Sequence, residues 1–192
     1  AETLDAIARR VLRSGIGTGD AASVLDRVPF AIAGFGYLEN CIEYRQRALT
    51  LYESMEGDHR QAVAQELNSL AGLNISKGSY EEAERQSRRA LDIRKKLYGE
   101  SDHADVAQSY VSLGVIASRK GDAAGAEAYY REGLRIYQNV YQAPHKTIAN
   151  TLNNLGALYG STGKLLLAEQ YYQSAIEMRM ALYQGPHESV AD

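Results

Sequence analysis

One segment occurs three times in this chain, with a copy every 42 or 43 residues. Seven positions hold the same residue in all three copies. They are Ala64, Ala107 and Ala149; Leu70, Leu113 and Leu155; Gly78, Gly121 and Gly163; Ala83, Ala126 and Ala168; Glu84, Glu127 and Glu169; Tyr98, Tyr141 and Tyr183; and His103, His145 and His187. A repeat of this length is typical of stacked-repeat proteins, in which each unit packs only against its neighbours. The sequence therefore predicts a long surface rather than one deep catalytic core.

Each copy has the pattern of two helices joined by a turn. In the third copy Ile148, Leu152 and Leu155 fall on one stripe of a helix with about 3.6 residues per turn. Gly163 interrupts that stripe, as glycine does just past a helix end. A second stripe ends at Gly185-Pro186, because proline cannot continue the helical hydrogen bonds. No segment alternates with a period of two, so the pattern predicts an all-α fold.

Small residues at fixed places indicate that the two helices of a unit pack closely. One such column lies on the first helices and another on the second helices. The two columns are Ala71, Gly114 and Gly156, and Ala83, Ala126 and Ala168. Cys41 occupies the second column one unit earlier, so we interpret it as a small buried packing residue and not as a reactive thiol.

These features resemble the tetratricopeptide repeat family. The spacings L-G-x-x-Y from residue 155 and A-x-x-x-Y-x-x-A from residue 168 match the signature of that family. The unit here is about eight residues longer than the usual repeat of that family, and phrases such as T-L-N-N-L from residue 151 are similar to the kinesin-light-chain subclass. The resemblance implies a right-handed superhelical solenoid of antiparallel helix pairs. It also implies a concave groove, lined by the first helices, that binds extended peptides.

Residues 36–192 are predicted to form the repeat array. We expect the second helix of one repeat at 36–57, full repeats at about 63–105, 106–147 and 148–189, and the start of a further repeat at 190–192. Residues 1–35 are expected to form a degenerate repeat or N-terminal capping helices. Pro29 interrupts their apolar stripe, and a terminal unit commonly departs from the repeat pattern because it covers the end of a stack.

Composition limits the partners of this chain. Its 21 Lys and Arg residues against 24 Asp and Glu give a net charge of −3, without the basic excess that binding to nucleic acid uses. No apolar run approaches the roughly 18 residues of a membrane-spanning helix. The single cysteine cannot form an internal disulfide. We therefore expect a cytoplasmic protein with neither a nucleic-acid nor a membrane partner.

The sequence offers no constellation for catalysis, a metal or a cofactor. The repeated histidines lie one unit apart, which separates them by roughly 16–20 Å, whereas zinc ligands converge to about 2 Å from one point. We expect these histidines to serve turns and helix starts. The glycine-rich run at 14–19 follows no predicted strand and lacks the Gly-Lys-Ser/Thr ending of a phosphate loop. No grouping of Ser, Cys and His suggests a nucleophile and its base.

The resemblance to the repeat family implies which residues face the groove. They are Gln65, Asn68 and Gly72; Gln108, Val111, Val115 and Arg119; and Asn150, Asn153, Ala157 and Ser161. An amide has both a donor and an acceptor, so Asn68 and Asn153 suit the N–H and C=O groups of a peptide backbone. The valines suit an apolar side chain and Arg119 an acidic one. Family members that grip a C-terminal carboxylate place Lys or Arg beside Asn, and the matching positions hold neither here.

Two functions remain open at this point. The first is a non-catalytic scaffold that belongs to a larger protein and binds an extended protein or peptide segment in the groove. The second is a regulatory or oligomerisation segment of a larger signalling or effector protein. That segment would act by intramolecular contact, or by self-association through exposed repeat ends.

Overall fold

The computed structural model describes residues 38–142 and 144–183 of the chain. The expectations for residues 1–35, for His187 and for a repeat starting at 190–192 lie outside these residues. The described chain consists of α-helices joined by turns and has no strand, so the predicted all-α helical repeat is confirmed. The helices are α3 (Leu38–Ser54), α4 (Arg60–Lys77), α5 (Tyr80–Tyr98), α6 (Ala104–Arg119), α7 (Ala123–Val140), α8 (Lys146–Ser161) and α9 (Leu165–Tyr183).

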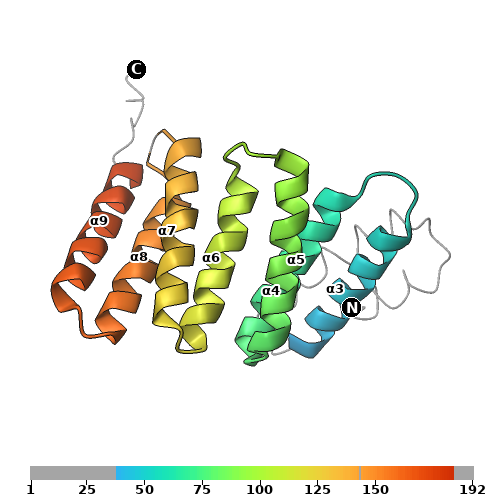
Figure 1. Cartoon of the computed structure of the whole chain (residues 1–192), viewed down its shortest axis with the longest axis horizontal. Coiled ribbons are helices and arrows are strands. Elements are labelled where there is room, and N and C mark those ends of the chain that lie inside the picture. The colour runs from blue at the N-terminus through green and yellow to red at the C-terminus, as the bar shows by residue number, and fades with distance from the viewer. Residues whose placement is uncertain (1–37, 143, 184–192) are drawn as a thin grey trace, which may run out of the picture. The chain divides into compact units, whose positions relative to one another are not determined.

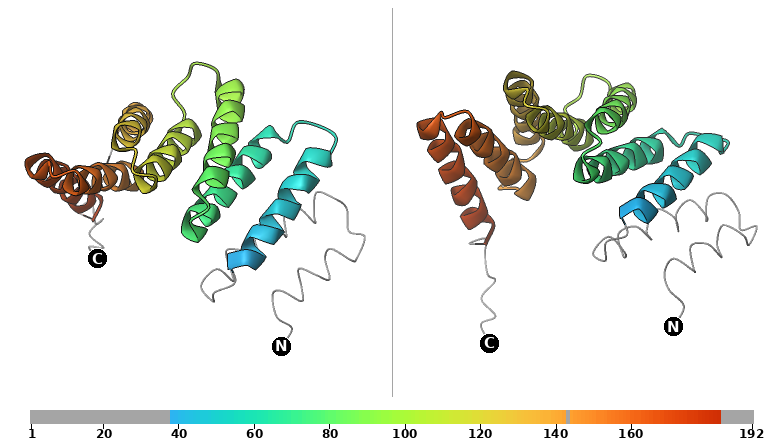
Figure 2. Two further views of the ribbon diagram at one scale, coloured as in Figure 1. Left: turned by 60° about the horizontal axis from the view of Figure 1, so that its bottom comes forward. Right: turned by 90° about the horizontal axis from the view of Figure 1, so that it is seen from below.

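The chain divides into two compact units, Ala1–Gly99 and Glu100–Asp192. In the first unit, α4 packs against both α3 and α5. In the second, α6 packs on α7, α7 on α8, and α8 on α9, and the first helices α6 and α8 also contact each other. Consecutive helices within each unit run antiparallel, and short turns join the helices of each pair (Figures 1 and 2).

A left-handed glycine ends the first helix of each repeat. Gly78, Gly121 and Gly163 have φ angles of 84°, 82° and 75°. This backbone region strains a residue that has a Cβ atom but not glycine. After α4, the Gly78 and Ser79 N–H groups donate to the carbonyl oxygens of Ile75 and Asn74, so the last turn of the helix is satisfied by its own backbone. This explains why the same glycine recurs in all three copies.

In the second repeat, and again in the third, a tyrosine of the second helix packs tightly on a glycine of the first helix. A Cβ atom placed on Gly114 would lie 2.6 Å from the ring of Tyr130, and one on Gly156 would lie 2.8 Å from the ring of Tyr172. The tyrosine ring therefore rests on the backbone of the first helix. The first repeat has Ala71 and Ser87 at these two positions, and both are fully buried. The small residues of the predicted column are thus confirmed as packing residues.

Histidines begin two of the first helices, as predicted from their repeated position. The Nδ1 atom of His103 accepts a hydrogen bond from the backbone N–H of Asp105 at 3.1 Å. The Nδ1 atom of His145 accepts one from the N–H of Thr147 at 3.3 Å. Each imidazole thus caps one of the N–H groups that a helix start leaves without a partner. The His145 ring also stacks on Tyr141, with centroids 3.7 Å apart.

Polar side chains, which sequence reasoning missed, lie in the core of the first unit. Glu66 on α4 is 1% exposed and accepts two hydrogen bonds from Arg45 on α3, at 3.1 and 3.2 Å. Asn74 donates to the buried Gln86 at 3.0 Å, which joins α4 to α5. Buried charges and amides need partners because they have lost their water, so these pairs specify how the three helices fit together.

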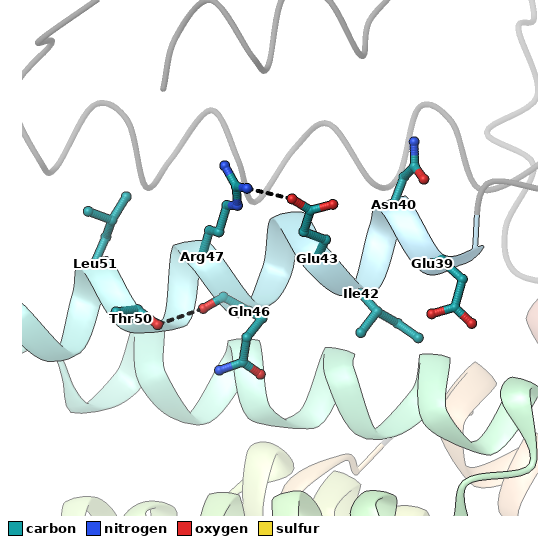
Figure 3. A pocket seen from close by; sticks show the side chains of 8 residues that line it. All are labelled: Glu39, Asn40, Ile42, Glu43, Gln46, Arg47, Thr50 and Leu51. Atoms are coloured by element: carbon teal, nitrogen blue, oxygen red, sulfur yellow. Dashed lines mark hydrogen bonds and ion pairs between the residues drawn. The ribbon is translucent and has the colours of Figure 1, made fainter. Parts of the chain in front are cut away.

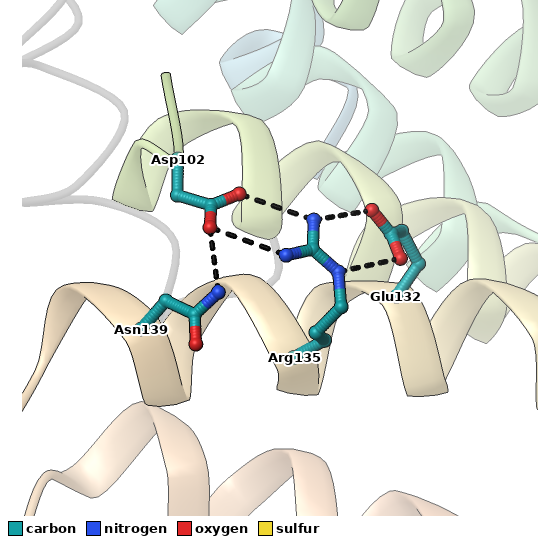
Figure 4. Close-up of polar contacts among 4 residues, drawn as sticks. All are labelled: Asp102, Glu132, Arg135 and Asn139. Atoms are coloured by element: carbon teal, nitrogen blue, oxygen red, sulfur yellow. Dashed lines mark hydrogen bonds and ion pairs between the residues drawn. The ribbon is translucent and has the colours of Figure 1, made fainter. Parts of the chain in front are cut away.

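A surface network joins the segment before α6 to α7 (Figure 4). The Arg135 guanidinium donates to both carboxylate oxygens of Asp102, at 3.1 and 3.2 Å, and also to Glu132. Asn139 donates to the same Asp102 carboxylate at 2.7 Å. The hydrogen bonds from Asn139 and Arg135 lower the pKa of Asp102 below its usual value. Asp102 precedes the capping His103, so the network holds the start of α6 against α7.

Candidate ligand-binding surface

The predicted site residues lie on the first helices, and all of them except Asn68 are exposed or half-buried. On α6 and α8 these residues recur at intervals of three or four, which places them on one stripe of each helix. We call these two stripes the α6–α8 surface: Gln108, Val111, Val115 and Arg119 on α6, and Asn150, Asn153, Ala157 and Ser161 on α8. The two helices touch within the second unit, so the structure brings these residues onto adjoining helices. It describes Gln65, Asn68 and Gly72 separately, on α4 of the first unit.

The α6 stripe is apolar in its middle and charged at its end. Val111 and Val115 are half-buried. Val111 packs on the second helix, since its Cγ2 atom would lie 2.7 Å from a Cβ placed on Gly133 of α7. Arg119 is exposed in the last turn of α6. The α6 stripe therefore presents two half-buried valines, followed by the guanidinium of Arg119.

The α8 stripe is more open and mostly polar. Asn150, Ala157 and Ser161 are exposed, and Asn153 is half-buried. The Ser161 hydroxyl donates to the carbonyl oxygen of Leu158 at 2.8 Å, so its proton is used within the helix. The Asn150 side-chain oxygen accepts a hydrogen bond from Arg179 of α9 at 3.2 Å.

In the first unit, the three predicted residues differ in accessibility. Gln65 is exposed, and its side-chain oxygen accepts a hydrogen bond from Arg94 of α5 at 3.2 Å. Gly72 is exposed, with nothing within 4 Å of the place where a Cβ would stand. Asn68 is only 9% exposed. Gln65 is therefore the more accessible of the two amides.

Sequence reasoning missed the arginines that hold these amides. Arg94 and Arg179 occupy the same position of the repeat, and so do their acceptors Gln65 and Asn150. The second repeat has Tyr137 at the arginine position. The column of Arg, Tyr and Arg is visible in the sequence. The bond itself joins residues 29 positions apart, and a repeat alignment alone does not reveal it.

The described residues contain little that points to catalysis or metal binding. Among them, no three His, Cys, Asp or Glu side chains come together in a way that could hold a metal ion. Cys41 is fully buried, and burial raises the pKa of its thiol, which opposes the reactive thiolate form. Burial likewise raises the pKa of Tyr130 to about 12. These groups act as packing residues.

A pocket along α3 does not bring together a reactive set of side chains (Figure 3). Its described lining comes from one face of this helix: Glu39, Asn40, Ile42, Glu43, Gln46, Arg47, Thr50 and Leu51. Glu43 is paired with Arg47, and the Thr50 hydroxyl donates to the Gln46 carbonyl. Glu39 is paired with Lys77 of α4. The charged groups shown here are thus neutralised by neighbours.

An aromatic cluster joins α7 of the second repeat to α8 and α9 of the third repeat. Tyr159 is 1% exposed, and its hydroxyl accepts a hydrogen bond from Arg131 at 2.9 Å. Its ring stacks on Tyr171 with centroids 5.3 Å apart. Burial, with the neighbouring Glu127, raises the pKa of Tyr159 to about 12. The phenol therefore stays protonated at neutral pH and serves as a structural contact.

Comparison with protein families identifies the repeat. A family model described as Tetratricopeptide repeat matches residues 63–139 and, in a second placement, residues 105–181. Together the two matches cover more than half of the chain. No curated protein matches the chain. Among the described residues, no helix combines the length and the apolar character needed to cross a membrane.

Several solved structures share the fold. BtubC (BKLC) from P. vanneervenii has a TM-score of 0.78 and 24% identity, over 98% of this chain and 78% of that one. The apo form of RapI has a TM-score of 0.77 and 19% identity, over 91% of this chain and 61% of that one. A Rap protein complexed with Competence and Sporulation Factor has a TM-score of 0.74 and 18% identity, over 94% of this chain and 50% of that one. At these identities the likeness concerns the fold alone.

Proposed function

We propose that this chain, which belongs to the tetratricopeptide repeat family, is a non-catalytic scaffold that binds an extended protein segment. The binding surface of the second unit would be the α6–α8 surface. In the first unit, Gln65, Asn68 and Gly72 hold the equivalent repeat positions on α4, and they are considered separately. One of the similar structures is a Rap protein in complex with a factor, so a related fold accommodates a partner. We place this activity in the cytoplasm.

The carrying observation is the combination of groups on the α6–α8 surface. Half-buried Val111 and Val115 still expose part of their apolar surface, and half-buried Asn153 lies on the adjoining helix. Amides pair with the N–H and C=O groups of an extended backbone whatever its side chains, while an apolar strip selects one apolar residue. The exposed Arg119 at the end of α6 favours an acidic residue in the bound segment.

An array of 12-residue peptides, acetylated and amidated at their ends, tests this function. Peptides that bind are measured by calorimetry against Asn153→Ala and Arg119→Ala. Loss of one hydrogen-bonding side chain should weaken binding about three- to tenfold. Gln138→Ala is the matched control, because Gln138 is exposed on the second helix α7. Binders that respond to neither substitution on the first helices would disprove this assignment.

A second candidate function is self-association through the exposed apolar side chains of α9. Leu165, Leu166 and Ile176 on α9 are 70%, 78% and 50% exposed. Exposed apolar residues gathered on one element mark an interaction surface. Sedimentation equilibrium of the chain over a hundredfold concentration range tests this alternative. Self-association that Ile176→Lys abolishes would support it, and a monomer at all concentrations would exclude it.

A further inference from the structure

We infer that Arg94 in the first unit and Arg179 in the second unit are positioning residues, and that each determines which hydrogen-bonding group a neighbouring amide presents to a ligand. Each arginine comes from a second helix and orients a side-chain amide on the first helix of the same repeat, Gln65 and Asn150 respectively. The oriented amide turns its NH2 group away from the arginine, so a ligand atom that contacts this group must be a hydrogen-bond acceptor. This inference rests on the proposed function and specifies the chemistry of the same surface.

The geometry determines the orientation of each amide. The guanidinium nitrogens of Arg94 and Arg179 lie 3.2 Å from the amide oxygens of Gln65 and Asn150. A guanidinium has donors and no acceptor, so the amide atom that faces it must be the oxygen. An isolated amide can rotate to present either its oxygen or its nitrogen, and here the arginine removes that choice.

The NH2 group of each amide remains available to a ligand. The oxygen and the nitrogen of an amide lie on opposite sides of its plane's axis, so the NH2 group points away from the arginine when the oxygen faces it. Gln65 and Asn150 are both exposed. Within the part of the chain that the structure describes, the NH2 groups of these two amides donate no hydrogen bond to the protein. Water satisfies these donors in the free protein, and a ligand acceptor can replace it.

The backbone carbonyl of a bound extended segment is the acceptor that we assign. Such a segment presents carbonyl oxygens at regular intervals along each side, and the oriented donor within each unit can bind one of them. The second repeat provides an internal comparison, because Tyr137 replaces the arginine there. Tyr137 is 5% exposed and stacks on Tyr141. The second repeat therefore lacks an arginine at the position that pairs with Gln65 and Asn150 in the other two.

The free protein allows a first test that needs no ligand. The Asn150 side-chain NH2 signals are assigned in an ¹⁵N NMR spectrum as the pair that disappears in Asn150→Asp. We expect Arg179→Leu to move the chemical shifts of this pair toward those of a free amide and to speed the exchange of its protons with water. Arg85→Leu is the control, since it removes the same charge from an exposed site on α5. An unchanged Asn150 pair in Arg179→Leu would overturn the inference.

Peptide binding gives the second test, with the tightest peptide from the array as the probe. Each backbone carbonyl oxygen is replaced in turn by sulfur, which is a weaker acceptor. We expect one substitution to weaken binding to the wild-type chain about three- to tenfold. That sensitivity should vanish in Arg179→Leu and also in Asn150→Asp, which keeps an oxygen facing the arginine but loses the NH2 donors. Arg179→Lys should restore part of it.

The outcomes separate this inference from the proposed function. If no peptide depends on the α6–α8 surface, the proposed function fails, and the NMR result still decides whether the arginine orients the amide. If sulfur sensitivity persists in Arg179→Leu, the arginine does not position the donor, and the inference is wrong. If only replacement of an acidic side chain in the peptide has this Arg179-dependent effect, the acceptor is a carboxylate, and the backbone assignment is wrong.

Discussion

At Gly114 a missing side chain decides how two helices approach each other. The ring of Tyr130 occupies the space that a Cβ atom would fill, and Tyr130 is itself only 4% exposed. The first repeat solves the same packing problem with Ala71 and Ser87. The size of one residue is therefore matched to the size of its partner across the helix pair, and changing one of them alone should introduce strain.

We predict that Gly114→Ala destabilises the protein by about 1–3 kcal/mol, because the new methyl group overlaps a ring that is packed on all sides. Tyr130→Ser should cost about 3 kcal/mol or more by removing a buried aromatic side chain. Urea denaturation of the two single variants and the double variant measures their coupling. The double variant should lose less stability than the sum of the two single losses. Additive losses would show that the ring and the added methyl group do not compete for space.

At the scale of single helices, the starts of α6 and α8 depend on histidine. Helix starts usually carry Ser, Thr, Asp or Asn as the capping residue, whereas His103 and His145 accept the backbone hydrogen bond here. His145 also stacks on Tyr141, so its imidazole combines two roles. This explains why the position is constant among the copies although no metal site uses it among the described residues.

We predict that His145→Ala lowers stability by about 0.5–2 kcal/mol through loss of the cap. His145→Asn should recover most of the capping contribution, because an amide oxygen accepts the same backbone hydrogen bond while the ring contact is lost. Thermal unfolding followed by circular dichroism compares the two variants. Equal losses in both variants would mean that the stacking on Tyr141, and not the cap, stabilises the helix start.

The contribution of the α6 start to the stability of the fold should also depend on pH, through Asp102. Hydrogen bonds from Asn139 and Arg135 lower the pKa of Asp102 in the folded state. A carboxyl whose folded pKa is depressed stabilises the fold above its unfolded pKa of about 3.9, and this contribution is lost as the pH falls through the folded pKa. The stabilisation should therefore be present at pH 7 and decrease below about pH 4.

We predict that the urea midpoints of wild type and Asp102→Asn differ at pH 7, and that this difference shrinks as the pH falls below about 4. The difference should be small, because the network is exposed to water. Asp92→Asn is the control, since Asp92 is an exposed carboxylate on α5, and it should leave the midpoint unchanged at pH 7 and at pH 3. A difference for Asp102→Asn that is the same at pH 7 and pH 3 would show that the carboxylate charge is not its cause.

At the scale of the whole molecule, equivalent residues have different surroundings. Leu134 on α7 and Ile176 on α9 occupy the same repeat position. Leu134 is 9% exposed and Ile176 is 50% exposed. In the second unit α7 packs against both α6 and α8, whereas α9 packs mainly against α8. Position along the array, and not the repeat itself, sets how much an apolar side chain contributes to stability.

We predict that Leu134→Ala destabilises the protein by about 2–4 kcal/mol, and that Ile176→Ala costs less than about 1 kcal/mol, because half of this side chain is already in water. Urea denaturation at two protein concentrations provides the measurement. Equal losses, with midpoints that rise with concentration, would show that a second copy of the chain covers α9 in solution.

The sequence by itself determined the local structure of this protein. The repeat period, the apolar stripes and the turn glycines predict the helix pairs, because helical periodicity and left-handed backbone are properties of a few consecutive residues. The spacings that resemble the family signature also pointed to the family to which the chain belongs. The repeat positions of the candidate site residues follow from the same register.

Only the tertiary structure decided the surroundings of those residues. Asn68 and Asn153 occupy equivalent repeat positions, yet Asn68 is almost covered while Asn153 is half-buried. The hydrogen bonds from Arg94 to Gln65 and from Arg179 to Asn150 join residues that are distant in the chain. Burial and hydrogen bonding of a side chain depend on atoms that folding brings near from elsewhere, and a local pattern contains no information about those atoms.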